Sequence, residues 1–290
     1  MKNKIINLCN QLLFKKNLRI MRLLKHGKQY LFFDLKTHIN YFDIEGEPKY
    51  VIKKNHPIKD KEKISKIENW VEYFLLCQSK TNVAKLLYFF NDSFGQLKQD
   101  LFVLSYFNFK EKGFFIEFGA ADGINLSNTF LLEKEFKWDG IVAEPAKKFH
   151  DSLFENRNCF IETDCVWDKT GVKVKFVEDG LLSTIDEFKC KDMHSRNSNV
   201  NYMVNTISLN NLLEKYDAPK IIDYLSIDTE GSEYEILKSL DFKTYTFKII
   251  TVEHNYTENR NKIYNLLTEN GFKRVYNEIT DYDDWYVLIS

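Results

Sequence analysis

The stretch that most constrains the fold of this chain is residues 113–123, which read GFFIEFGAADG. Its short aromatic and aliphatic run is typical of a strand that is buried on both faces of a sheet. Glu117 lies near the carboxyl end of that run, and Gly119 and Gly123 then frame a turn before residues 126–136, which can form a helix. A strand-end carboxylate, two glycines that let a ligand approach the backbone, and a helix N-terminus together predict a cradle for a small molecule.

The spacing of the cradle indicates which molecule it binds. A nicotinamide-dinucleotide turn reads G-x-G-x-x-G, whereas this chain has E-x-G-x-x-x-G from Glu117 to Gly123. A carboxylate there would repel a pyrophosphate but suits the ammonium group of S-adenosylmethionine (SAM). A second apolar run, residues 140–143, ends on Glu144 and Pro145, 21 residues beyond Gly123, where a βαβ layout puts the acid that accepts ribose hydroxyls. The two acid-tipped strands together predict SAM as the ligand.

A third predicted strand, residues 158–162, is followed by Asp164 and Cys165. An acid at this tip suits the adenine amino group, and the next backbone N–H suits a ring nitrogen of the purine. An Asx-type turn, in which Asp164 caps its own backbone, explains the same residues on local grounds. Both interpretations stay open at this point.

A polar insert, residues 180–205, interrupts the alternation of predicted strands and helices. Long irregular segments in compact domains are more often functional than decorative. The insert is therefore the predicted substrate loop, with His194 and Arg196 as side chains that can contact a polar acceptor or simply lie in solvent.

Two more buried strands are predicted at residues 221–227 and 247–252, and each is followed by acids. Asp228 and Glu230 follow the first strand, and Glu253 and His254 follow the second. A helix at 258–269 and an antiparallel hairpin complete the chain. Alternating strands and helices predict an α/β fold with a mostly parallel sheet, so the strand-tip acids should face one crevice.

These acids allow two kinds of chemistry. His254 beside Glu253 can act as a general base whose tautomer is fixed by a carboxylate. Alternatively, Asp228, Glu253 and His254 can hold Mg²⁺ or another divalent cation that acidifies an acceptor hydroxyl. The sequence leaves both alternatives open.

Residues 1–92 are predicted to be an N-terminal α+β extension of unknown role, followed by a domain at 93–290. Residues 1–28 are basic, and their apolar residues recur near a helical period. A solvated docking helix and peripheral contact with an anionic membrane both fit this pattern. Residues 29–53 are predicted to form short strands and residues 59–79 a helix.

Composition limits the partners and the location. The 290 residues carry a formal net charge of −1, so the overall charge does not indicate nucleic-acid binding. The five cysteines are scattered and include no C-x-x-C pair, which argues for a reducing cytoplasm and against a zinc site. No apolar run reaches the roughly 18 residues of a transmembrane segment. We expect a cytoplasmic protein that can form a homo-oligomer.

Several segments resemble the FkbM-type SAM-dependent methyltransferases: FFIEFGAADG (114–123), NLSNT (125–129), GIVAEP (140–145), YLSIDTEGSEYEIL (224–237), VEHN (252–255) and DWYVLI (284–289). The resemblance implies a class I, Rossmann-like methyltransferase fold, SAM as cofactor and O-methylation. The cofactor-binding residues are then predicted to be Glu117, Gly119, Ala120, Asp122, Gly123, Ser127, Asn128, Glu144, Pro145, Asp164, Cys165 and Asp228. The predicted catalytic residues are Asp228, Glu230, Glu253 and His254.

The functional hypothesis is a SAM-dependent O-methyltransferase that acts on a hydroxyl of a saccharide or nucleotide-linked sugar, such as a surface-glycan precursor. The saccharide class comes from the resemblance alone. Two alternatives are a NAD-dependent nucleotide-sugar oxidoreductase, which the missing G-x-G-x-x-G disfavours, and a non-catalytic SAM-binding scaffold.

Overall fold

The computed structural model describes residues 18–23, 30–34, 39–42, 49–52, 85–86, 89, 92–192, 194–277 and 280–289. The chain divides into two compact units, residues 1–93 and 94–290, so the boundary lies one residue beyond the position that the sequence predicts. The first unit contains an antiparallel sheet of four strands in chain order: β1 (Leu18–Leu23), β2 (Tyr30–Asp34), β3 (Ile39–Phe42) and β4 (Lys49–Ile52).

Strand β1 corrects part of the expected N-terminal helix. Its residues pair with β2, from Leu18 opposite Asp34 to Leu23 opposite Tyr30, so their backbone groups are satisfied between strands rather than within a helix. The rest of residues 1–28 and the helix expected at 59–79 lie outside the described residues. The strands expected within residues 29–53 are confirmed as β2, β3 and β4.

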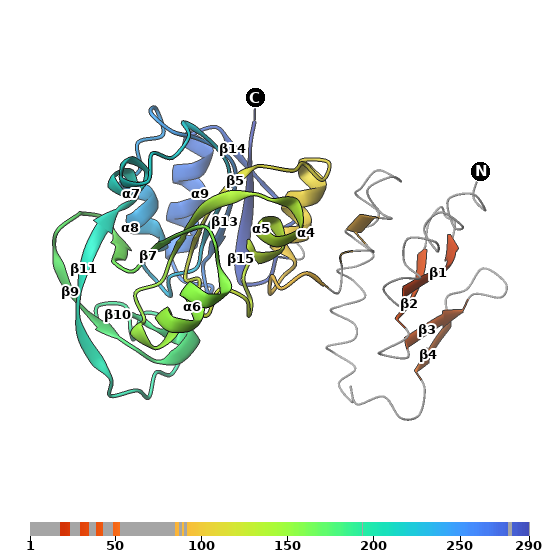
Figure 1. Ribbon diagram of the computed structural model, residues 1–290, viewed down its shortest axis with the longest axis horizontal. Coiled ribbons are helices and arrows are strands. Elements are labelled where there is room, and N and C mark those ends of the chain that lie inside the picture. The colour runs from red at the N-terminus through yellow and green to blue at the C-terminus, as the bar shows by residue number, and fades with distance from the viewer. Residues whose placement is uncertain are drawn as a thin grey trace. The chain divides into compact units, whose positions relative to one another are not determined.

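A seven-stranded sheet forms the centre of the second unit (Figure 1). Its order is β14 (Phe272–Val275), β15 (Asp283–Leu288), β13 (Thr246–Glu253), β12 (Ile221–Ile227), β5 (Phe114–Phe118), β6 (Asp139–Ala143) and β7 (Phe160–Glu162). The strands from β13 to β7 are parallel neighbours, whereas β15 is antiparallel to both β13 and β14. The predicted mostly parallel sheet with a C-terminal antiparallel hairpin is therefore confirmed.

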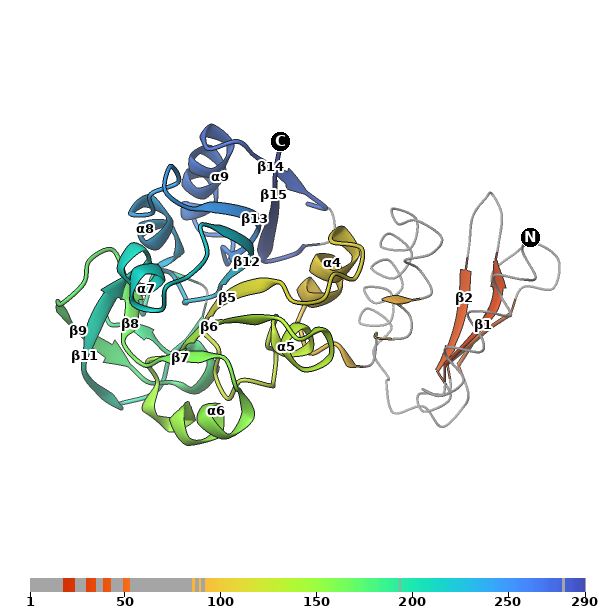
Figure 2. The ribbon, with the colours of Figure 1, turned by 45° about the horizontal axis from the view of Figure 1, so that its top comes forward.

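Helices cover both faces of this sheet (Figure 2). One face carries α7 (Leu209–Lys215), α8 (Glu233–Lys238) and α9 (Asn259–Glu269), whose buried leucines and isoleucines pack in one core with alternate residues of β5 and β12. The other face carries α4 (Gln99–Tyr106) and α5 (Phe130–Phe136). There Phe102 of α4 stacks on Trp285 of β15 with 4.7 Å between ring centroids. The sheet is thus the middle layer of three, as the alternation of strands and helices predicts.

A smaller four-stranded sheet lies beside the end of β7, in the order β10 (Thr184–Ile185), β9 (Lys173–Val177), β11 (Asn201–Ser208) and β8 (Cys165–Trp167). It corrects the expectation of an irregular insert, because β10 and the start of β11 fall within residues 180–205. In β11 buried Val204 stands between exposed neighbours and packs against Phe176 and Ile185. The insert therefore contains a strand with one buried face, which its polar composition does not indicate.

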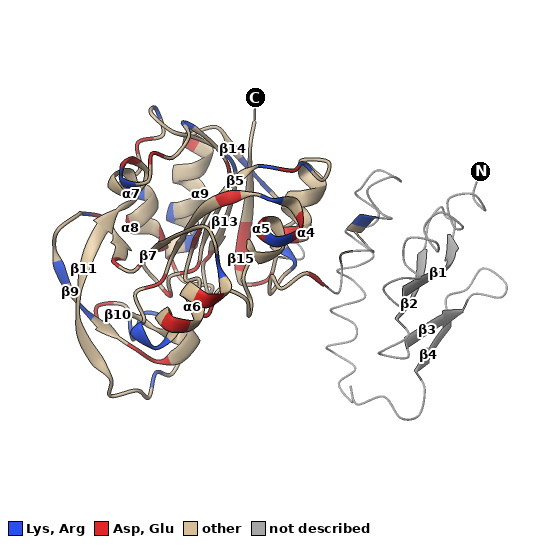
Figure 3. Ribbon diagram, in the orientation of Figure 1, with Lys and Arg blue, Asp and Glu red and all other residues tan. Residues whose placement is uncertain are grey.

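The remaining short elements connect these layers: η2 (Lys147–Phe149) and α6 (His150–Asn156) follow β6, and η3 (Gly180–Leu182) precedes β10. Figure 3 shows acidic and basic residues interspersed along the ribbon of the second unit. Among the residues that the structure describes, no helix is both long and apolar enough to cross a membrane.

Candidate functional site

A cavity of about 250 Å³ opens at the carboxyl ends of β5, β6, β12 and β13. Because these strands are parallel, the residues that follow them meet at one edge of the sheet. Nine predicted site residues line the cavity: Glu117, Gly119, Asn128, Glu144, Pro145, Cys165, Asp228, Glu230 and Glu253. Among the described residues predicted for the site, Ala120, Asp122, Gly123, Ser127, Asp164 and His254 do not line it.

Glu117 at the end of β5 is bonded almost entirely within the chain. Its Oε1 accepts from the backbone N–H of Asn128 at 2.6 Å, and its Oε2 accepts from the hydroxyls of Ser127 and Thr129 at 2.8 and 2.6 Å. The buried guanidinium of Arg157 also donates to Oε2 at 3.3 Å. Glu117 therefore organises the turn around the cavity as well as lining it.

These contacts explain why α5 starts at Phe130 rather than at residue 126, as the sequence predicts. Residues 127–129 turn their donors toward Glu117, and Leu126 adopts a left-handed φ of 61° that a continuous helix does not allow. Asp122 accepts instead from the backbone N–H groups of Ile124 and Asn125, so it shapes the turn from outside the cavity.

The first glycine of the turn permits a very close backbone approach. Gly119 has φ of 78°, and a Cβ there would lie 1.9 Å from the backbone oxygen of Asp228. Only glycine fits between the ends of β5 and β12 at this point. Gly123 has the same handedness and leaves room for Arg157. Ala120 is buried, and its N–H donates to the oxygen of Ala143 on β6.

Asn128 brings an unpartnered acceptor to the cavity wall. Its Nδ2 donates to Ser226 Oγ on β12 at 2.9 Å, while its buried Oδ1 has no hydrogen-bond partner in the described part of the chain. A buried amide oxygen without a partner lowers stability, so it fits a site that receives a donor from a ligand.

Glu144 at the end of β6 is 5% exposed. Its two oxygens accept from the backbone N–H groups of Ala121 and Ala146, each at 2.8 Å. Burial raises the pKa of Glu144 to about 7, and the two N–H bonds only partly offset this effect. The carboxyl group therefore changes charge near neutral pH.

The end of β7 differs from the sequence interpretation. The strand ends on Glu162, whose Oε1 accepts from the N–H groups of Thr163 and Asp164, and whose Oε2 accepts from Lys215. Asp164 thus stands in the turn and not on the cavity wall, whereas Cys165 starts β8 and lines the cavity beside Val166. Glu162 is therefore the acid at the strand end, and its carboxylate, rather than that of Asp164, caps the turn.

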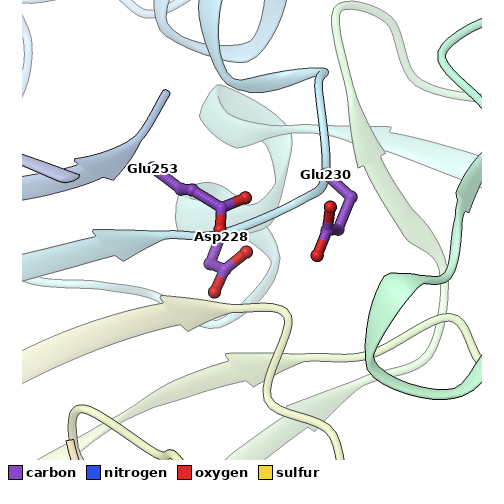
Figure 4. A group of neighbouring side chains, drawn as sticks. All are labelled: Asp228, Glu230 and Glu253. Atoms are coloured by element: carbon purple, nitrogen blue, oxygen red, sulfur yellow. The ribbon is translucent and has the colours of Figure 1, made fainter. Parts of the chain in front are cut away.

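Three carboxyl groups crowd the opposite end of the cavity, which we call the carboxylate cluster: Asp228, Glu230 and Glu253 (Figure 4). One oxygen from each lies within 4.8 Å of the others. Burial raises the pKa of all three, and for Glu230, whose pKa rises to about 9, the charge of Asp228 adds to the effect. The cluster is held together against mutual repulsion, which is typical of functional sites.

The turn between β12 and α8 positions two members of the cluster. Glu233 Oε1 accepts from the N–H groups of Thr229 and Gly231 and from the Thr229 hydroxyl at 2.9 to 3.1 Å. This clamp supports Glu230 in a left-handed conformation with φ of 59°. The run D-T-E-G-S-E thus contains two cavity acids and one structural acid.

The insert docks on the same turn. Arg196 donates to Glu230 Oε2 at 2.9 Å, to both oxygens of Asp192, and to the carbonyls of Leu182 and Lys189. Its side chain is only 2% exposed. Arg196 therefore fastens the insert over the cavity, and His194 lines the cavity from the same segment.

The structure corrects the placement of His254. Its ring is buried, Nδ1 accepts from the N–H of Tyr256, and Nε2 lies 3.8 Å from Asp284 Oδ1. Burial lowers the pKa of His254 to about 4, which outweighs the effect of Asp284. Because β13 ends at Glu253, the next side chain points to the opposite side of the sheet and away from the cavity.

Sequence reasoning missed several wall residues. Ser226 is the residue before the last one of β12, so its place beside Glu117 follows from strand register once the sheet order is known. Tyr282 comes from the turn before β15, and the apolar wall comes from the insert and its neighbours, with Phe149, Leu181 and Ile185. The sequence offered only the hairpin as a signal for Tyr282 and no signal for the apolar wall.

Comparison with protein-family models gives one match, the methyltransferase FkbM domain, over residues 117–284, which is more than half of the chain. Among curated proteins, no match was found. The matched range starts at Glu117 and includes all three members of the carboxylate cluster.

Solved structures of methyltransferases are also similar. An FkbM methyltransferase from Methylobacillus flagellatus matches at 11% identity and a TM-score of 0.41, covering 78% of this chain and 60% of that chain. A precorrin-6y C5,15-methyltransferase from Geobacter metallireducens matches at 11% identity and a TM-score of 0.36, covering 60% of this chain and 71% of that chain. The matched part of this chain thus spans less than two thirds of the M. flagellatus protein.

Proposed function

Since the chain belongs to the FkbM methyltransferase family, we propose that it is a SAM-dependent O-methyltransferase whose acceptor is a hydroxyl of a saccharide or nucleotide-linked sugar. One observation carries the proposal: a single cavity joins an acid-lined cradle at β5 and β6 to a carboxylate cluster at β12 and β13. One end fits the cofactor and the other fits the acceptor.

The cavity residues suit SAM. Glu117 and the unpartnered Oδ1 of Asn128 would face its ammonium group, and Glu144 would accept its ribose hydroxyls. The wall beside Cys165, Val166 and Phe149 is apolar and suits the adenine ring. When bound, SAM would supply an electrophilic methyl group to the acceptor oxygen and leave as S-adenosylhomocysteine, while a carboxylate of the cluster would take the hydroxyl proton.

The chain's own part in this reaction is alignment and proton acceptance. Asp228 lies where the backbones of the β5 and β12 turns touch, so it is the member of the cluster beside the proposed cofactor end. A carboxylate of the cluster accepts the hydrogen bond of the acceptor hydroxyl and then its proton. His254 has no place in this proposal because its ring faces Asp284.

The polar residues of the wall support a hydroxyl-rich acceptor. Gln96, Asn125, His194, Asn255 and Tyr282 line the same cavity and offer donors and acceptors of hydrogen bonds. The saccharide class rests on this polarity and on the family resemblance. Cytoplasmic location, self-association, the lack of nucleic-acid binding and membrane contact through residues 1–28 stay predictions.

Calorimetry with SAM and S-adenosylhomocysteine, followed by turnover on a panel of sugars and sugar nucleotides, tests the proposal. We expect binding of both ligands and a product that is heavier by one methyl group. Binding of NAD in place of SAM would contradict the assignment. Binding of SAM without turnover on any hydroxylated acceptor would favour a non-catalytic scaffold.

A further inference from the structure

We propose that the carboxylate cluster of Asp228, Glu230 and Glu253 binds a hard divalent cation such as Mg²⁺, Mn²⁺ or Ca²⁺, which in turn binds the acceptor hydroxyl. The proposal rests on the proposed function for its purpose, but the binding of the cation is testable without turnover. It changes the predicted ligand set, because Glu230 takes the place that the sequence gave to His254.

The geometry of the cluster suits one cation. The three acids come from two neighbouring parallel strand ends, and one oxygen from each lies within 4.8 Å of the others. Oxygens at that spacing need only a small contraction of the side chains to reach a common Ca²⁺ ion at about 2.4 Å, and a slightly larger one to reach Mg²⁺ at about 2.1 Å. The three side chains surround a common space in Figure 4.

An unpartnered buried oxygen provides an independent sign of a missing ligand. Glu253 is 7% exposed, and its Oε2 has no hydrogen-bond partner among the described residues. The carboxyl group points toward Asp228 (Figure 4). A buried carboxylate oxygen without a partner is costly, whereas the acid of the β5 end has every oxygen bonded. A cation would satisfy the Glu253 oxygen.

Charge balance leads to the same conclusion. The three carboxyl groups face one guanidinium, that of Arg196, which binds Glu230 Oε2 and is also paired with Asp192. Negative charge therefore remains without a positive partner when the cluster ionises, and a divalent cation would offset it. The other titratable groups that act on the cluster are Glu117, Asp192, His194, Glu233 and Asp283.

The chemistry of the ligands selects the class of ion. All three ligands are carboxylates, which prefer Mg²⁺, Mn²⁺ and Ca²⁺, whereas Zn²⁺ favours histidine and cysteine. A cation that binds the acceptor oxygen lowers the pKa of its hydroxyl and fixes its orientation. The cluster would thereby serve acceptors that carry adjacent hydroxyls, which can chelate the same ion.

Mn²⁺ binding to the full chain provides the test, measured from the paramagnetic resonance signal of free Mn²⁺, with S-adenosylhomocysteine binding measured in parallel by calorimetry without metal. We expect one Mn²⁺ per chain and binding at least about ten-fold weaker in Glu253→Gln. Glu269→Gln removes the same charge from an exposed position on α9 and should bind Mn²⁺ like the native chain.

A second measurement guards against a misfolded variant. Mn²⁺ should raise the thermal midpoint of the native chain and of Glu269→Gln but not that of Glu253→Gln. Undetectable Mn²⁺ binding by a chain that still binds S-adenosylhomocysteine would overturn the cation site and leave the proposed function standing. Equal Mn²⁺ affinity in the native chain and in Glu253→Gln would also overturn the cation site. A native chain that does not bind S-adenosylhomocysteine would instead contradict the proposed function.

Discussion

The two ends of the cavity use buried carboxylates in opposite ways. At the end of β5, Glu117 receives two hydroxyls, a backbone N–H and the guanidinium of Arg157. At the ends of β12 and β13, only Glu230 of the three carboxyl groups binds an arginine, and Glu253 keeps an oxygen without a partner among the described residues. The first arrangement stabilises the turn. The second brings like charges close together, and a positively charged ligand would reduce their repulsion.

The difference shows how a structural acid at a strand end can be distinguished from one that is available to a ligand. Glu117, Glu230 and Glu253 are all buried and all line the cavity, so neither burial nor position separates the two kinds of acid. The two kinds of acid differ in the number of hydrogen-bond donors around each carboxyl group. A substitution at the β5 end should therefore lower mainly stability, whereas a substitution in the carboxylate cluster should lower mainly activity.

The largest effect is expected at the β5 end. Glu117→Ala leaves the buried Arg157 without one of its two carboxylates and removes the acceptor for three donors, so the free energy of unfolding should fall by about 3–5 kcal/mol. Denaturant unfolding measures the loss, with Glu269→Ala as the exposed control. A loss below about 1 kcal/mol would show that Glu117 is no better bonded than the cluster acids.

At the cluster, the effect should shift from stability to turnover. Asp228→Asn removes one of the mutually repelling charges, so the unfolding free energy in the presence of a chelator should stay the same or rise by about 1 kcal/mol. The turnover number should fall by about 100-fold or more, because the acceptor loses its aligned carboxylate. If Asp228→Asn were strongly destabilised but kept its turnover number, the expected difference between the two ends would be wrong.

Glu144 should make cofactor binding depend on pH. Its pKa rises from 4.5 to about 7, so it is mostly protonated below that pH, and the ionised form accepts ribose hydroxyls better. The affinity for S-adenosylhomocysteine should therefore increase by up to about ten-fold as the pH rises through neutrality. The folded state retains this proton to higher pH than the unfolded state does. The free energy of unfolding should therefore decrease as the pH rises from 4.5 to about 7, and it should stay lower above that range.

Calorimetry over that pH range measures the slope, and Glu144→Gln should flatten it. The variant keeps an acceptor oxygen for one of the two backbone N–H groups, so the turn should persist. An unchanged slope in Glu144→Gln would assign the pH dependence to another group.

The smallest effect is expected where the insert meets the cluster. Arg196→Lys keeps a positive charge but loses the fork that binds Asp192 and Glu230 together. The KM for the acceptor should rise by roughly three- to ten-fold, with little change in S-adenosylhomocysteine affinity. Steady-state kinetics and calorimetry on the same variant measure both. A larger effect on cofactor than on acceptor would place the insert at the cofactor end.

Much of the fold could be predicted from the sequence because its strands are short apolar runs that end on acids. Residues 114–118, 221–227 and 246–253 form central parallel strands, and the hairpin of β14 and β15 closes the sheet. The strand within residues 201–208 was hidden because one of its faces is exposed and polar, so the composition resembled a loop. Its partners come from far along the chain, which local patterns do not reveal.

The site was less predictable at the level of single residues. Spacing placed Glu117, Glu144, Asp228 and Glu253 at one edge, and the structure brings them to one cavity. Spacing did not show that Glu253, the last residue of β13, lines the cavity whereas His254, the next residue, is buried beside Asp284. Nor did it show that Glu233 clamps the turn while Glu230 faces the cavity, because that depends on the left-handed backbone at Glu230.

The close approach of Gly119 to the backbone oxygen of Asp228 limits the substitutions that this turn can accept. Even alanine at position 119 would displace the turn after β12 that carries Asp228, so a substitution meant to reshape the proposed cofactor end of the cavity would also move a member of the carboxylate cluster. Libraries that aim to change the transferred group should therefore leave this glycine untouched and vary the wall formed by Leu181 and Ile185 instead.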